Sequence, residues 1–157
     1  MKRVTIVILV LLVAASAGAW EFDGRTDLMT DAVTNYARLR AIDHQNTAGA
    51  PVLVIRTAGD KITIYITSGP DLVARDVSEI LVRFGSSDPI SWPAAPGTSP
   101  RTVVIQDTDR FLERMRFKRL VVQWEGTLTY RPGGTIRNMI GVWNIDDIDE
   151  LLRRLGQ

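Results

Sequence analysis

The most acidic stretch of the chain is the run Asp146-Asp147-Ile148-Asp149-Glu150. Grouped carboxylates are the ligands that hard cations such as Ca²⁺ prefer. The same residue types also suit the start of a helix, whose backbone N–H groups carry partial positive charge. Because the run stands directly before leucines at helical spacing, we interpret it as a helix N-terminus and not as a metal site.

Two further positions could take part in hydrolysis. His44, the only histidine, follows Asp43 in a polar stretch that holds no nucleophile motif. Ser86 and Ser87 lie in the tetrapeptide GSSD, which lacks the Gly-x-Ser-x-Gly pattern of a nucleophile elbow. A general base needs partners that this sequence does not reveal. We therefore interpret all three as loop residues.

Carboxylate pairs such as Glu125 with Asp107 or Asp109 would suit glycoside hydrolysis only at a defined separation, which the sequence does not give. The chain has no cysteine, which excludes thiolate zinc sites and cysteine nucleophiles. Its single histidine excludes a multi-histidine metal site. The sequence thus predicts no catalytic residue, no cofactor and no metal.

The N-terminus resembles an export signal. Lys2 and Arg3 precede the apolar run 4–13, and the small residues Ala17-Gly18-Ala19 follow it. An apolar core of roughly 10 to 13 residues is shorter than the roughly 20 that a spanning helix needs. We expect a signal peptide over residues 1–19 and one exported domain over 20–157, periplasmic or secreted, with no stable membrane span after cleavage. An uncleaved anchor is the alternative.

Size and charge restrict the class of protein. Removing 19 of the 157 residues leaves 138, which suits a single domain with its own core. The whole chain has 19 basic and 18 acidic residues, and loss of Lys2 and Arg3 leaves 17 against 18. Nucleic-acid binding proteins carry a basic excess, so we expect no nucleic-acid partner.

The exported part is dominated by two-residue alternation of apolar and polar side chains, which is typical of β-strands. Gly59-Asp60 and Gly133-Gly134 each separate two such runs and predict two hairpins. We expect a mainly β protein with two short helices, of α+β class, built as an antiparallel sandwich or open barrel of about seven strands. The predicted strands cover residues 34–42, 52–55, 61–67, 76–84, 102–105, 120–130 and 136–143.

Both predicted helices lie in the second half of the chain. The first opens at Asp107-Thr108-Asp109, where we expect an N-cap, and presents Phe111, Leu112 and Met115 inward. The second follows the acidic run. Its apolar stripe consists of Ile145, Ile148, Leu151, Leu152 and Leu155.

Two tryptophans are candidate interface residues. Residues 85–100 hold four of the seven prolines, so we predict an irregular loop with Trp92 in its middle. Trp92 then either anchors a partner or folds back onto the sheet. Trp20, at the expected mature N-terminus, carries the same two alternatives. Trp124 and Trp143 lie in predicted strands and are expected in the core.

The order of these landmarks resembles the VasI/TagO-type proteins found with bacterial type VI secretion systems. Relatives commonly carry a cysteine where Thr57 stands, and often an acidic residue where Gly85 stands, so a shared scaffold need not imply a shared role. The family supplies no established catalytic residue. The motifs that carry the resemblance are Trp20, MTD at 29–31, LVIR at 53–56, I-x-I-Y-I at 62–66, VRF at 82–84 and Trp143-Asn144-Ile145.

We therefore expect a non-enzymatic periplasmic interaction or accessory protein, connected with a type VI secretion or cell-envelope complex. Its partner would be an unidentified envelope or secretion-system protein, bound through exposed strand edges or the Trp92 loop. The alternatives are a periplasmic hydrolase acting on cell-wall material, which requires a deep pocket, and a small-ligand carrier, which requires a lined cavity.

Overall fold

The computed structural model describes residues 19–27, 30, 32–47, 49–68, 72–73, 77–128 and 135–156. The predicted signal peptide, apart from Ala19, lies outside these residues, as do Tyr130 and the turn Gly133-Gly134. No helix within the described ranges is long and apolar enough to cross a membrane. The protein is mainly β with two short helices, as predicted.

All the described strands belong to one antiparallel sheet of eleven strands. Ten follow each other in the order β1-β2-β4-β5-β9-β8-β7-β10-β11-β3, and β6 pairs with β10 beside that path. The strands are β1 (Glu21–Thr26), β2 (Val33–Arg40), β3 (Asp43–Gln45), β4 (Val52–Ala58), β5 (Lys61–Thr67), β6 (Leu72–Val73), β7 (Glu79–Phe84), β8 (Ile90–Pro96), β9 (Thr102–Ile105), β10 (Arg119–Leu128) and β11 (Thr135–Asn144).

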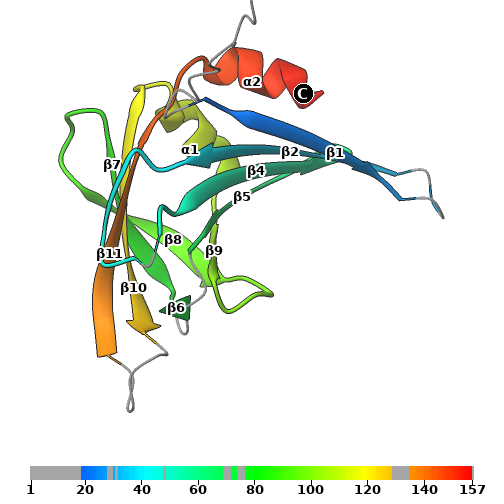
Figure 1. Ribbon diagram of the computed structural model, residues 1–157. Coiled ribbons are helices and arrows are strands. Elements are labelled where there is room, and N and C mark those ends of the chain that lie inside the picture. Colours follow the sequence, from blue (N-terminus) through cyan, green and yellow to red (C-terminus); the bar gives the residue numbers. More distant parts are fainter. Residues whose placement is uncertain are drawn as a thin grey trace, which may run out of the picture.

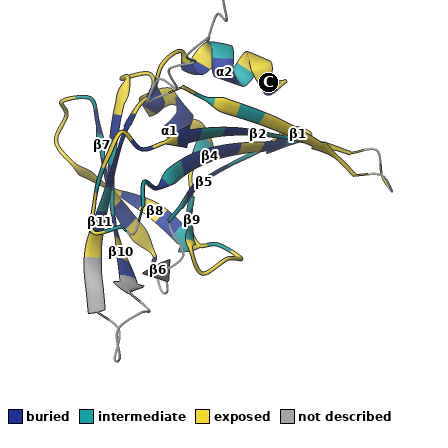
Figure 2. Ribbon diagram, in the orientation of Figure 1, coloured by how far each residue is buried: buried dark blue, intermediate teal, exposed yellow. Residues whose placement is uncertain are grey.

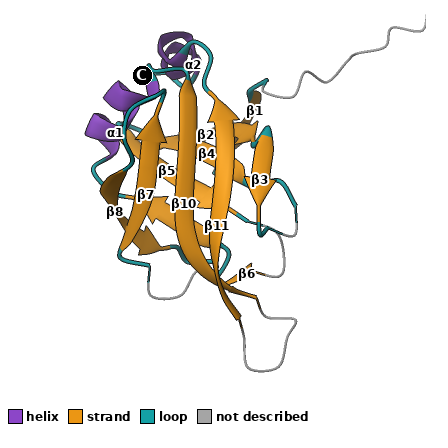
Figure 3. Cartoon of the chain, turned by 90° about the vertical axis from the view of Figure 1, so that its left-hand side faces the viewer, coloured by secondary structure: helices purple, strands orange, loops and turns teal. Residues whose placement is uncertain are grey.

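The sheet bends into two layers that face each other across the core. Strands β7, β10 and β11 form one layer, and β2, β4 and β5 cross behind them in the other (Figure 3). Strand β8 makes one corner, because Ile90 to Pro93 pair with β7 while Ala94 to Pro96 pair with β9. Strands that switch layers at a bend are the usual corners of crossed sheet packing.

A second corner lies between β2 and β3. The N–H of Ala41 donates to Pro51 of the β4 side at 2.9 Å, and the next N–H, of Ile42, donates to Val142 of β11 at 2.8 Å. Two consecutive residues therefore join opposite layers. The two ends of the strand path are nevertheless β1 and β3, which are not paired with each other.

Alternating side chains of both layers fill the interior, which Figure 2 shows as the dark-blue inner parts of the strands. Trp143 lies at its centre, fully buried, and its indole N–H donates to the Leu39 carbonyl of the opposite layer at 3.0 Å. Gly141 makes room for that ring, since a Cβ there would overlap the Trp143 indole. Burial of these apolar surfaces stabilises the fold without any disulfide.

The two helices close one open end between the layers (Figures 1 and 3). Helix α1 (Thr108–Met115) buries Phe111, Leu112 and Met115, as predicted. Helix α2 (Ile148–Arg154) buries Ile148 and Leu151 in the same core. Side chains from the sheet hold its C-terminal end.

The Leu155 carbonyl, at that end, accepts two hydrogen bonds from the sheet. The hydroxyl of Thr57 on β4 donates at 3.2 Å, and the Asn35 amide on β2 donates at 3.4 Å. Thr57 is the one polar residue buried among the described part of the core. The position where relatives were expected to carry cysteine therefore anchors α2.

The predicted irregular loop over residues 85–100 is wrong, because residues 90–96 form strand β8. Proline is normally confined to edges and bends of sheets, since it cannot donate to the ladder. Strand β8 lies inside the strand path, but the sheet bends there, and Pro93 and Pro96 lie on either side of that bend. The predicted number of about seven strands is accordingly too low.

Trp92 of β8 is 1 % exposed and is part of an aromatic cluster. Its ring meets Phe84 of β7 and Phe111 of α1 edge-on, with centroids 5.8 and 5.3 Å away, and its indole N–H donates to the Gln106 carbonyl at 2.8 Å. Of the two alternatives for Trp92, the structure therefore shows the inward one. The residue is not available as a surface anchor.

The helix starts were predicted in the right places, with one error in detail. Asp147 caps α2, and its carboxylate accepts from the Glu150 N–H at 3.1 Å. Asp107 precedes α1 in the left-handed conformation, but its side chain makes no capping hydrogen bond. Its carboxylate lies 3.7 Å from the Arg110 guanidinium instead.

Candidate functional site: a basic sheet face

The outer face of β1, β2, β4 and β5 points away from the core and carries most of its long side chains as cations and tyrosines. We call this surface the basic face. Alternation places these residues together because their neighbours on the same strands are buried inside. In register across the four strands, the rows are Glu21, Arg38, Val54 and Tyr65; Asp23, Tyr36, Arg56 and Thr63; and Arg25, Thr34, Ala58 and Lys61; with Arg40, Val52 and Thr67 in a further row.

The charge of this face differs from that of the whole chain. Five basic and two acidic residues lie on it, a difference of +3, whereas the complete chain carries +1. The surplus is therefore a local property of the fold. The basic residues are Arg25, Arg38, Arg40, Arg56 and Lys61, and the acidic ones are Glu21 and Asp23.

Tyr36 stands at the centre of a small charged network on β1 and β2. The guanidinium carbons of Arg38 and Arg25 lie 5.1 and 5.8 Å from its ring centroid. The Asp23 carboxylate lies 3.5 Å from Arg38 and 3.8 Å from Arg25. These contacts hold the Tyr36 ring between two cations and keep both guanidinium groups close to the sheet.

Tyr65 lies across β4 from Arg38 and is half-buried. Between the two strands, Val54 is only 2 % exposed although it is on the outer face. Burial raises the pKa of Tyr65 above its usual 10.0, Tyr36 adds to this increase, and the positive charges of Arg38, Arg56 and Arg25 oppose it. The face thus combines neutral phenols with cations, a combination that recognises carboxylates and other anions.

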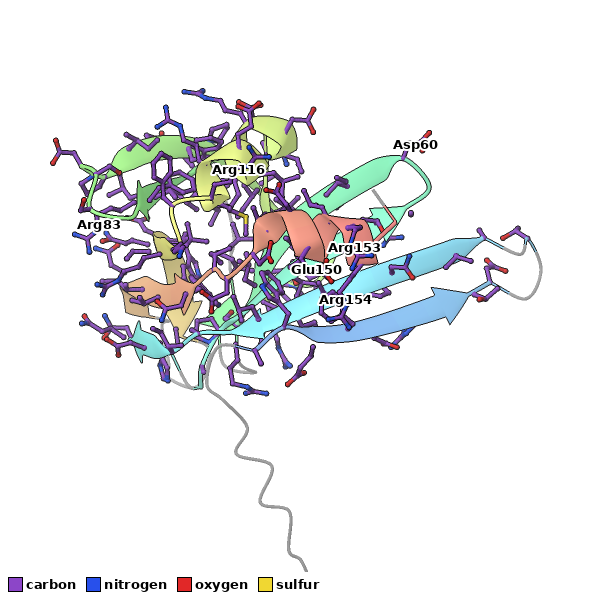
Figure 4. The ribbon with its side chains drawn as sticks, turned by 90° about the horizontal axis from the view of Figure 1, so that it is seen from above. Asp60, Arg83, Arg116, Glu150, Arg153 and Arg154 are labelled. Atoms are coloured by element: carbon purple, nitrogen blue, oxygen red, sulfur yellow. The ribbon has the colours of Figure 1, made fainter. Side chains whose placement is uncertain are left out.

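Arg56 and Arg40 differ from Arg38 in having no ion pair within the described part of the chain. Both are exposed, as is Lys61 at the start of β5. Their charges are therefore open to an external anion. Asp60, in the turn before Lys61, lies at the tip of the β4–β5 hairpin (Figure 4).

A separate hollow of about 390 Å³ lies in the other layer. Here the β10 ladder to β7 ends at Gln123, and the ladder to β6 begins at Thr127, so the chain between β6 and β7 is longer than the facing stretch 124–126. Such irregularities leave space beside a strand. The lining is Val77, Ser78, Glu79, Ile80, Leu81, Ser91, Gln123, Trp124, Glu125 and Asn138.

Two carboxylates face this hollow, and one of them is oriented by a neighbour. The Ser91 hydroxyl donates to Glu79 Oε2 at 2.6 Å. Glu125, on β10, lines the hollow together with Glu79. The sequence analysis considered Glu125 with Asp107 or Asp109, but Asp107 instead pairs with Arg110 at the start of α1.

The second candidate interface residue, Trp20, is only partly exposed. It directly precedes β1 and packs against the core. Its indole nitrogen is buried and has no hydrogen-bond partner among the residues that the structure describes. Trp20 and Trp92 are therefore not brought together as an exposed aromatic patch.

The other residues considered for chemistry lie apart from one another. His44 is in the short strand β3, where its Nδ1 lies 2.7 Å from the Thr47 hydroxyl. Ser86 and Ser87 are exposed in the turn between β7 and β8. The Ser87 hydroxyl donates to the Asp88 carbonyl at 3.3 Å. No described side chain joins the histidine to these serines.

The acidic run at 146–150 is a helix start, as interpreted. Glu150 forms a 2.7 Å ion pair with Arg153, and Asp149 forms a 2.9 Å ion pair with Arg116, the residue that ends α1 (Figure 4). Arg154 lies with its guanidinium carbon 3.7 Å from the Phe22 ring centroid. These carboxylates are thus engaged in holding α2.

In the described parts of the chain, no three His, Asp or Glu residues are grouped as metal ligands. The basic face was not identified from the sequence, although alternation did place Tyr36, Arg38 and Arg40 on one side of their strand. The missing signal was the pairing of β2 with β4, which no hairpin predicts. Comparison with protein-family models, curated proteins and solved structures gave no match.

Proposed function

We propose that this chain is a non-enzymatic interaction protein that binds its partner through the basic face. The observation that carries the proposal is the segregation of charge, with +3 on one sheet face of a chain whose total is +1. Arginine and tyrosine are enriched in protein interfaces, because each offers a large contact area together with hydrogen bonds.

The contacts within the face support binding more than stability. The Asp23 and Arg25 side chains are 43 % and 72 % exposed, and ion pairs of this kind contribute only about 0 to 1 kcal/mol. The Tyr36 and Arg38 side chains are held in place by their neighbours before any partner arrives. Pre-ordering of this kind lowers the entropy cost of binding.

The proposal extends to the protein's setting. We propose an exported domain that works in the periplasm as an accessory of an envelope or type VI secretion complex, in line with the resemblance of its motifs to the VasI/TagO-type proteins. For the architecture, we propose a crossed β-sandwich of the open-barrel kind, with the corners at β8 and Ala41–Ile42.

A photo-crosslinking amino acid placed in the protein, in the cells that naturally make it, tests the function. Thr63 lies on the basic face beside Arg56, and Glu113 on α1 is an exposed control position at the other end. We expect a discrete adduct from Thr63 and none from Glu113. No adduct at Thr63, or the same adducts from both positions, would contradict the proposal.

The hollow beside β7 supports a second candidate function, a small-ligand carrier or a hydrolase for cell-wall material. Its volume of about 390 Å³ falls within the range of small-molecule sites. If this candidate is right, Glu79→Gln and Glu125→Gln each abolish binding or turnover of cell-wall fragments. Unchanged binding in both variants would remove the hollow from consideration.

A further inference from the structure

Four cations on the basic face form a diagonal line, which we call the cationic row. It runs from Lys61 on β5 through Arg56 on β4 to Arg38 and Arg40 on β2. Each step crosses to the next strand and the next outward position, or moves two residues along β2. Strands about 4.8 Å apart with outward side chains every 6.8 Å or so put successive cations about 7 to 8 Å apart.

This spacing matches one kind of ligand. In an extended peptide, side chains on the same side recur about every 6.8 Å, because alternate residues face the same way. Four acidic residues at every second position therefore keep pace with the four cations of the row. A helix has no matching series, since its same-face residues follow steps of three and four at 1.5 Å rise.

We infer that the partner presents an extended segment with acidic residues at alternate positions, and that this segment lies along the cationic row. The inference rests on the proposed function of the basic face and names its ligand. Arg40, Arg56 and Lys61 receive carboxylates directly. Arg38, which already contacts Asp23 at 3.5 Å, marks the middle of the row.

The surroundings of the row favour a protein segment over a phosphate polymer. Glu21 and Asp23 border it on the β1 side, and their negative charge opposes a dense, uniform polyanion. On the other side Tyr65 and Thr63 offer hydroxyl groups and ring surface to a mixed polar and apolar chain. Alternating acidic and neutral side chains suit both borders.

The size of the face predicts a weak, salt-sensitive complex. Four strands by four rows cover about 19 Å by about 27 Å, or about 500 Å² in projection. This is less than the roughly 800 Å² per partner of a standard interface. We therefore expect a complex that dissociates readily and weakens as salt screens exposed charges.

Binding of two synthetic peptides to the purified full-length protein tests the inference. One peptide alternates glutamate with serine, and the other has the same composition with its glutamates in one block. Inorganic polyphosphate of equal total charge is the third probe. The protein variants are Arg40→Glu/Arg56→Glu on the face and, as a matched control, Arg114→Glu/Arg119→Glu away from it, where both arginines are exposed.

We expect the alternating peptide to bind about fivefold or more tightly than the block peptide, and the face variant to lose about tenfold of that affinity while the control changes less than about twofold. Equal binding of the two peptides would overturn the matching of spacing. Tighter binding of polyphosphate would assign the row to a phosphate polymer and overturn the inference. Failure of all three probes, with the Thr63 adduct intact, would leave the proposed function standing and contradict only its acidic ligand.

Discussion

The aromatic cluster around Trp92 and the basic face around Tyr36 reverse what composition suggests about them. Trp92 stands among prolines, in a stretch that resembles a loop, yet it is buried between Phe84 and Phe111. Tyr36 stands in a regular strand that resembles scaffold, yet it faces outward among cations. The contrast shows that exposure follows the strand's place in the sheet and not its local composition.

The two regions also differ in what holds them together. Edge-on aromatic contacts and apolar burial fix the Trp92 cluster, and these forces act between groups removed from water. The basic face relies on exposed ion pairs and cation–π contacts, which water and salt weaken. Substitutions in the first region should therefore change stability, and those in the second should change binding.

Replacement of Trp92 by alanine should have the largest effect. It removes a 1 % exposed ring and its hydrogen bond to Gln106, so we expect a loss of about 3 to 5 kcal/mol in the free energy of unfolding. Urea denaturation measures this. Arg56→Ala on the basic face is the control and should change stability by less than about 0.5 kcal/mol. A similar cost for both would erase the distinction between the two regions.

Gly141→Ala tests the packing of the core on the side of β11. Its new Cβ would overlap the Trp143 indole, which is fully buried and bonded to Leu39. Such overpacking costs about 1 to 3 kcal/mol, so the melting temperature should fall. Gly59→Ala, in the β4–β5 turn, is an unsuitable control because Gly59 has a φ of 57°. Gly49→Ala, where a Cβ meets nothing within 4 Å, should leave the melting temperature unchanged.

Thr57→Val should have a smaller effect on stability, because it removes one hydroxyl from a buried site without changing its volume much. The Leu155 carbonyl keeps its hydrogen bond from Asn35, so we expect a loss of about 1 kcal/mol. Thr63→Val on the basic face makes the same chemical change at a half-exposed site. An equal loss in both variants would show that Thr57 does not anchor α2.

Tyr65→Phe should alter only the alkaline part of the stability profile. The pKa of Tyr65 in the fold is raised above 10.0, so the unfolded chain releases that proton first and the fold loses stability as pH rises above this value. The Phe variant lacks this contribution and should lose less stability between about pH 9 and about pH 11. Urea denaturation at both pH values measures it, and a parallel decline in the two proteins would contradict the assignment.

Much of the scaffold could be predicted from the sequence. Alternation located β2, β4, β5 and β7, and helical spacing located both helices, because each pattern depends on one local period. Strand β8 was missed because proline lacks the N–H that a ladder needs, and only the bend of the sheet makes Pro93 and Pro96 acceptable there.

The candidate site was harder to predict, because it depends on which strands become neighbours. Tyr36 and Arg38 come from β2, Arg56 from β4 and Tyr65 from β5, and β2 reaches β4 without a hairpin. Net charge also hid the site. A total of +1 gives no indication that cations collect on one face while acidic residues gather at the helix starts.

The central claim is that the basic face, and not the aromatic cluster, is where this protein meets its partner. The most direct measurement compares the Thr63 photo-adduct in cells that make the unchanged chain with the adduct in cells that make Arg40→Glu/Arg56→Glu. We predict that the adduct falls by about tenfold or more while the melting temperature of the purified variant stays the same. An undiminished adduct from a folded variant would contradict this account.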